Sequence, residues 1–135
     1  MRVSDLMQTD LRTVRGEATV ADAVSLMAQY HISGLPVIDA HGHLVGVLTS
    51  SDILQAQAES DSPEERQRLF EETLVREIMT PRPQTIALEA TLKEAAQRLL
   101  YLEIHRLFVE GEGKLVGVIS TSDIVRALAT ARSEK

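Results

Sequence analysis

The chain has 135 residues, a length that fits one compact domain or two small, closely packed halves. Its net charge of -6 argues against a broad surface for nucleic acid or anionic membranes, and the absence of Cys excludes disulfides and thiolate metal sites. Aromatic residues make up only 3%, so base stacking has few platforms. We find no signal peptide and no apolar run of about 18 residues that could span a membrane, and we therefore expect a cytoplasmic protein.

The sequence repeats itself once along the chain. Met7 aligns with Met79 at an offset of 72, and Asp52 aligns with Asp123 at an offset of 71. The lost residue falls where AHGH in the first copy faces EGK in the second, and single-residue length changes belong in turns, so we predict a hairpin tip there. The predicted organisation is repeat 1 at 1–57, a charged helical linker at 58–74, repeat 2 at 75–130 and a C-terminal tail at 131–135.

The expected elements of the first repeat are a helical turn at 3–7, a strand at 13–14, a helix from 19, strands at 35–38 and 44–49, and a helix from near 52. The second repeat gives the same order at 75–79, at 85–86, from 91, at 107–109, at 115–120 and from near 123. Thr19 and Thr91 each precede an acidic residue by three positions, which is typical of a capped helix start. In the linker, Ser62 followed by Pro63 predicts one further helix.

This order of elements predicts a mixed α/β (α+β) fold. The first helix of each repeat supplies the crossover that a parallel pairing of the two strands around it requires. A three-stranded unit is marginal alone, so we expect the two β-α-β-β-α repeats to pack sheet to sheet with pseudo-twofold symmetry.

The most informative motif is a strand that runs through a hydroxyl-rich corner into a helix, GVLTSSD at 46–52 and GVISTSD at 117–123. A helix start attracts anions, Thr49 or Ser120 can donate to a phosphate, and Asp52 or Asp123 can accept both hydroxyls of a ribose. The same residues also make capping boxes, which need no ligand. The two interpretations are compatible, and the sequence leaves both open.

The doubled motif resembles the CBS domain, named after cystathionine β-synthase, whose tandem pairs are called Bateman modules. The resemblance implies a regulatory module that binds an adenosine ligand (AMP, ADP, ATP or S-adenosylmethionine) in a cleft between the repeats and transmits a conformational change to a partner protein. It also implies homodimers. No enzymatic domain accompanies the pair, so the chain resembles a free-standing, non-enzymatic member.

The resemblance assigns roles to residues at matching positions. Asp52 and Asp123 would bind ribose, and the phosphate ligands would be Thr49, Ser120, His105 and Arg106. The adenine side would be formed by Thr13, Val14, Thr85 and Ile86. Phe108 departs from the family pattern, which often has Pro at the place where the first repeat carries Pro36.

Two further interpretations concern metal binding and assembly. The pair His41-x-His43 lies in a predicted turn with no further ligand nearby, so we predict no metal site. The apolar run at 99–102 exceeds what one helix face can bury within a repeat, which predicts homodimerisation. The alternative function is therefore a structural, dimerising interaction protein with vestigial, ligand-free clefts.

Overall fold

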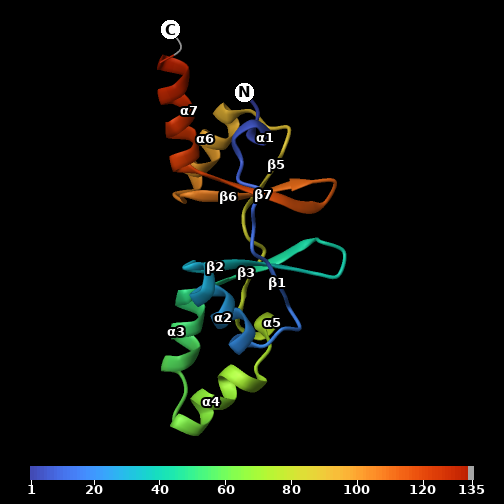
Figure 1. Cartoon of the computed structure of the whole chain (residues 1–135), viewed down its shortest axis with the longest axis vertical. Helices are drawn as coiled ribbons and strands as arrows, with labels where there is room; N and C mark the ends of the chain where they lie inside the picture. The colour runs from blue at the N-terminus through green and yellow to red at the C-terminus, as the bar shows by residue number, and fades with distance from the viewer. Residues whose placement is uncertain (134–135) are drawn as a thin grey trace. The chain divides into compact units, whose positions relative to one another are not determined.

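The structure is a computed structural model that describes residues 1–133, and it divides into two compact units (Figure 1). Unit 1 contains residues 1–11 together with the residues from 84 onward, and unit 2 contains residues 12–83. The units therefore differ from the sequence repeats, because the first eleven residues pack with the second repeat. Likewise, residues 75–83, which open the second repeat, pack with the first repeat in unit 2.

Unit 2 is built on a four-stranded sheet in the order β1-β2-β3-β4. Its strands are β1 (Val14–Arg15), β2 (Gly34–Ile38), β3 (Leu44–Thr49) and β4 (Thr80–Pro81). Its helices are α2 (Val20–Tyr30), α3 (Ser50–Ala58), α4 (Pro63–Glu72) and α5 (Val75–Ile78). The parallel pairing of β1 with β2 confirms the predicted crossover, whereas the short β4 was not expected.

Unit 1 has a three-stranded sheet in the order β5-β6-β7, again with a parallel first pair. Its elements are α1 (Val3–Leu6), β5 (Thr85–Ala87), α6 (Leu92–Leu102), β6 (Arg106–Gly111), β7 (Lys114–Ser120) and α7 (Thr121–Ser133). Helices α6 and α7 lie on one side of this sheet (Figure 1). Helix α7 continues through the first three residues of the predicted tail, and residues 134–135 of that tail lie outside the described part.

Strands β3, β6 and β7 alternate between buried and less buried positions over most of their length, because successive side chains point to opposite faces of a sheet, whereas β2 is buried at three consecutive positions, 35–37. Leu35, Val37 and Leu48 are fully buried in unit 2, and Leu107 and Val109 hold the equivalent places in unit 1. Both cores are aliphatic, as the low aromatic content requires. The mixed α+β class with two small sheets is confirmed.

Side-chain caps fix where the helices begin. Thr19 accepts the backbone N–H of Asp22 at 3.2 Å, and Ser62 accepts that of Glu65 at 3.2 Å. The helices expected from near 52 and 123 begin two residues earlier, at Ser50 and Thr121, because the capping residues are Thr49 and Ser120. None of the helices within residues 1–133 is long and apolar enough to cross a membrane.

The glycine in each corner motif permits a close backbone approach. A Cβ atom on Gly117 would lie 2.9 Å from the carbonyl oxygen of Gln8, and one on Gly46 would lie 3.0 Å from that of Thr80. Both distances are too short for a side chain, so the glycines let a second segment run beside β7 or β3. That segment brings Gln8 or Thr80 to the corner.

Candidate functional site

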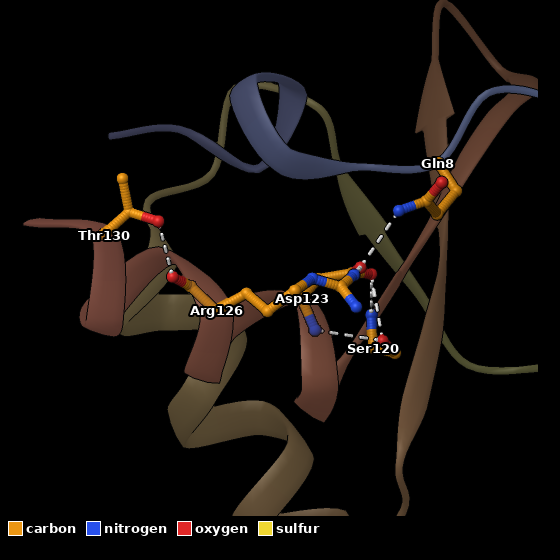
Figure 2. A network of polar contacts seen from close by, with 5 residues as sticks. All are labelled: Gln8, Ser120, Asp123, Arg126 and Thr130. Atoms are coloured by element: carbon orange, nitrogen blue, oxygen red, sulfur yellow. Dashed lines mark hydrogen bonds and ion pairs between the residues drawn. The ribbon is translucent and has the colours of Figure 1, made fainter.

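In unit 1 the corner is centred on the carboxylate of Asp123, which is 5% exposed at the start of α7 (Figure 2). Its Oδ2 accepts the backbone N–H and the hydroxyl of Ser120 at 2.8 and 2.9 Å. Its Oδ1 accepts a hydrogen bond from Gln8 Nε2 at 3.1 Å and forms an ion pair with the guanidinium of Arg126. We call this group of four residues the Asp123 corner.

These contacts determine the charge state of Asp123. Burial alone would raise the pKa of this carboxyl, but the hydrogen bonds from Ser120 and Gln8 and the charge of Arg126 outweigh it, and the pKa lies below its ordinary value of 3.8. Asp123 is therefore an anion at neutral pH. An ionised carboxylate is the form that accepts hydrogen bonds from two vicinal hydroxyls.

Unit 2 contains the equivalent Asp52 corner, formed by Thr49, Asp52 and Thr80. Asp52 Oδ2 accepts the backbone N–H and the hydroxyl of Thr49 at 2.9 and 3.1 Å, and its Oδ1 accepts the hydroxyl of Thr80 at 3.0 Å. The capping box predicted from the sequence is thus present in both corners. In each corner the box uses one carboxylate oxygen and leaves the other for side chains from elsewhere in the chain.

Gln8, Thr80 and Arg126 are the corner residues that sequence reasoning did not single out. Gln8 aligns with Thr80 at the offset of 72, one position beyond the aligned pair Met7 and Met79. The repeat alignment therefore held the signal for these two residues. Arg126 lies three positions after Asp123, where an ion pair on one helix face is ordinary.

The predicted phosphate ligands are only partly gathered around the corners. Thr49 and Ser120 are in place, but their hydroxyls are engaged with their own Asp. Arg106 is exposed at the start of β6 and pairs with Ser120 across the sheet, so the two side chains share a face. The His105 carbonyl accepts the backbone N–H of Thr121 at 2.9 Å, which ties the start of β6 to the start of α7.

The predicted adenine-side residues lie away from the aspartates within each unit. Thr85 pairs with Phe108, Phe108 with Val118, and Val118 with Gln8. At about 4.8 Å per strand, Thr85 is roughly 14 Å from Gln8 across the sheet. In unit 2, Thr13 precedes β1, at the opposite edge of its sheet from Thr80. Val14 and Ile86 are only 6% and 9% exposed, and their side chains belong to the two cores.

The Asp123 corner opens onto a cavity of about 330 Å³ between α1 and α7, near the lower end for ligand pockets. Its lining includes the charged side chains of Asp5, Asp123 and Arg126.

Within residues 1–133, no three His, Asp or Glu side chains come together as metal ligands. His43 Nδ1 instead lies 3.1 Å from Asp39 Oδ2 in the β2–β3 turn, and the backbone N–H of His43 is the main cause that lowers the pKa of Asp39.

The amino-acid sequence is similar to those of several known proteins. In Arabidopsis thaliana, the CBS domain-containing protein CBSX1, chloroplastic, is 32% identical over 139 residues, and CBSX2, chloroplastic, is 31% identical over 155 residues. The matches cover 87% and 98% of this chain, which spans only 59% and 65% of those relatives. Inosine-5'-monophosphate dehydrogenase from Mycobacterium bovis is 37% identical over 134 residues, a match that covers 95% of this chain and 23% of the enzyme.

Solved structures have the same fold. The crystal structure of CBSX2 in complex with AMP gives a TM-score of 0.77 at 34% identity, and the match covers 96% of this chain and 97% of the other. A Vibrio cholerae protein described as AcuB gives 0.84 at 31% identity, with coverage of 100% and 97%. The family model of the CBS domain matches residues 3–59 and 75–130, so the chain belongs to the CBS-domain family and carries two CBS domains.

Proposed function

We propose that the chain is a regulatory module that binds an adenosine ligand at its Asp corners. The observation that carries this proposal is the repeated carboxylate whose second oxygen, Oδ1 of Asp52 or Asp123, is contacted in the described part of the chain by the side chains of Thr80, or of Gln8 and Arg126, and not by the capping box. Ribose hydroxyls can replace such donors without disturbing the capping box. CBSX2, a relative with the same fold, is described in complex with AMP, which supports this ligand class.

The identity of the adenosine ligand is a further part of the proposal. A related CBS-pair structure, that of MJ0100 at 25% identity and a TM-score of 0.73, is described with 5'-methylthioadenosine and S-adenosyl-L-methionine. The candidates are therefore AMP, ADP, ATP and S-adenosylmethionine. The proposed phosphate ligands are Thr49, Ser120, His105 and Arg106, and Thr13, Val14, Thr85 and Ile86 are proposed for the adenine side. A regulated partner protein and a cytoplasmic location stay predictions.

Ligand binding is expected to raise the melting temperature. A ligand at 100 times its Kd stabilises the folded state by about 2.7 kcal/mol, which corresponds to roughly 5–10 °C for a chain of this size. Differential scanning fluorimetry with the four candidate ligands measures this shift, with guanosine monophosphate as the control for base selectivity. The absence of a shift with all four at millimolar concentration would contradict the proposal.

The ribose assignment predicts a loss of affinity for a deoxyribose ligand. Removing the 2'-hydroxyl leaves an acceptor on Asp52 or Asp123 without its ligand donor, which costs about 1–3 kcal/mol, or roughly 5- to 150-fold in Kd. Isothermal titration calorimetry of AMP against 2'-deoxy-AMP tests this. In the double variant Asp52→Asn/Asp123→Asn the two ligands should bind alike, and equal affinities in the wild type would remove the aspartates from the ribose role.

A second candidate function, homodimerisation, is favoured by exposed apolar side chains on the helices. Leu100 and Tyr101 on α6 are 78% and 87% exposed, and Val125 on α7 is 59% exposed. An apolar groove of about 370 Å³ between α6 and α7 adjoins Leu100 and Val125. We infer that a second copy of the chain covers this face. The position equivalent to Val125, Leu54 in unit 2, is 67% exposed, so both repeats carry the pattern that a twofold interface would use.

A charge on this face is expected to disrupt the dimer. Tyr101→Glu should weaken the dimer by 2 kcal/mol or more, about 30-fold in the dimer Kd, because an aromatic anchor is lost and a charge must be desolvated. Sedimentation equilibrium measures the change. Lys114→Gln, on the exposed β6–β7 hairpin, alters net charge equally and should leave the dimer intact. A wild-type monomer at micromolar concentration would contradict the dimer.

A further inference from the structure

The two Asp corners differ in how many internal donors occupy the carboxylate. A carboxylate has about four acceptor positions. At Asp123 four donors fill them, namely the backbone and hydroxyl of Ser120, the Gln8 amide and the Arg126 guanidinium. At Asp52 the described part of the chain supplies three, two from Thr49 and one from Thr80. A ribose diol needs two positions, so the Asp123 corner must release more of its own contacts.

The additional donor at the Asp123 corner is Arg126, and repeat 1 has no equivalent cation. The offset of 71 aligns Arg126 with Gln55. The Gln55 amide contacts Glu59 at 3.4 Å, and Glu59 lies about two helical turns after Asp52. The Arg126 side chain is 67% exposed, whereas its partner carboxylate is only 4% exposed. The guanidinium can therefore move into solvent, while the carboxylate remains where a ligand would meet it.

We propose that Arg126 competes with the ligand for Asp123 and so makes the two corners unequal, with the Asp52 corner filling first. This inference rests on the proposed function, because it concerns the same ribose-binding carboxylates. Ligand binding at the Asp123 corner exchanges the Arg126 ion pair for hydroxyl hydrogen bonds. The affinity of this corner therefore depends on the strength of that ion pair.

The competition predicts an unusual response to salt for an uncharged ligand. Adenosine carries no phosphate, so salt does not screen its own contacts with the protein. Salt does weaken the partly exposed Arg126–Asp123 pair, because the Debye length falls from about 14 Å at 0.05 M to about 4 Å at 0.5 M. Adenosine should consequently bind more tightly at the Asp123 corner as salt rises, and salt should have little effect at the Asp52 corner.

A reciprocal exchange between the repeats tests the proposal, with adenosine as the probe in isothermal titration calorimetry of the full chain. In an Asp52→Ala background, which leaves the Asp123 corner, Arg126→Gln should tighten adenosine binding roughly three- to tenfold and abolish the gain with salt. In an Asp123→Ala background, Gln55→Arg should weaken binding at Asp52 by a similar factor. The exchanged residues are the aligned pair, so each variant is the control for the other.

Each outcome separates the proposal from its rivals. An unchanged adenosine Kd in Arg126→Gln would overturn it. Weaker AMP binding with unchanged adenosine binding would also overturn it, because Arg126 would then be a phosphate ligand. If the wild type binds neither adenosine nor AMP, the proposed function itself fails. Carbon-13 NMR still tests the pair without ligand: the pKa of Asp123 should rise in Arg126→Gln, and an unchanged value would show that the pair does not form in solution.

Discussion

Asp123→Ala is expected to lower the free energy of unfolding by about 2–4 kcal/mol at pH 7, because it removes a buried carboxylate that satisfies four donors. Asp52→Ala should cost only about 1–2 kcal/mol, the usual loss for a helix cap, because Asp52 is less buried and accepts fewer hydrogen bonds. Urea unfolding followed by circular dichroism measures both values. Equal losses at the two positions would contradict the difference between the corners that we describe.

The lowered pKa of Asp123 gives this effect a pH dependence. A folded-state pKa below the ordinary value of 3.8 means that the carboxylate contributes its full stability above that value and loses it as the pH falls toward the folded-state pKa. Asp123→Asn should therefore be destabilising at pH 7 and progressively less so below about pH 4. Asp39 also has a lowered pKa, so the relevant quantity is the difference between the variant and the wild type. A difference that is constant from pH 7 to pH 3 would contradict the assignment.

Leu107→Ala is the second substitution for which we expect a large effect, a loss of about 2–5 kcal/mol. Leu107 is fully buried in the core of unit 1 together with Val3, Leu99 and Ile119. Truncation leaves a cavity that the closely packed β6 and β7 cannot close. Leu107→Met nearly conserves volume and should cost less than about 1.5 kcal/mol, which separates the cavity from a general intolerance at this position. Equal losses for both variants would contradict this account.

The regular elements could be predicted because local chemistry specifies them. Thr19, Thr49 and Ser62 cap helices with their own side chains, and the helical spacing of apolar residues predicts the buried face of α2. The one-residue difference between the repeats placed the hairpin tips correctly, at Gly42 and at Gly113, whose positive φ angles of 85° and 79° suit a tight turn. The aspartates followed from the same pattern, because a residue three positions after a cap faces back toward it.

The remaining parts of the site depend on contacts between distant segments, which no local pattern encodes. Gln8 reaches Asp123 across 115 residues of sequence, and Thr80 reaches Asp52 across 28. The strand β4 exists because the segment after α5 runs beside β3, an approach that Gly46 permits. The predicted adenine-side residues show that membership of one repeat does not by itself bring two residues together. Thr85 belongs to the same repeat as Asp123, but sheet order separates the two within unit 1.

The division of the chain into units has a consequence for folding during synthesis. Unit 2 is continuous from 12 to 83, so the ribosome delivers all of its strands before the second half of the chain emerges. Unit 1 combines the earliest residues with the latest ones, and Val3 enters a core whose other buried residues lie between Ile86 and Ile124. In nascent chains, unit 2 should therefore fold first. Residues 1–11 should stay unfolded until the strands of unit 1 have been synthesised.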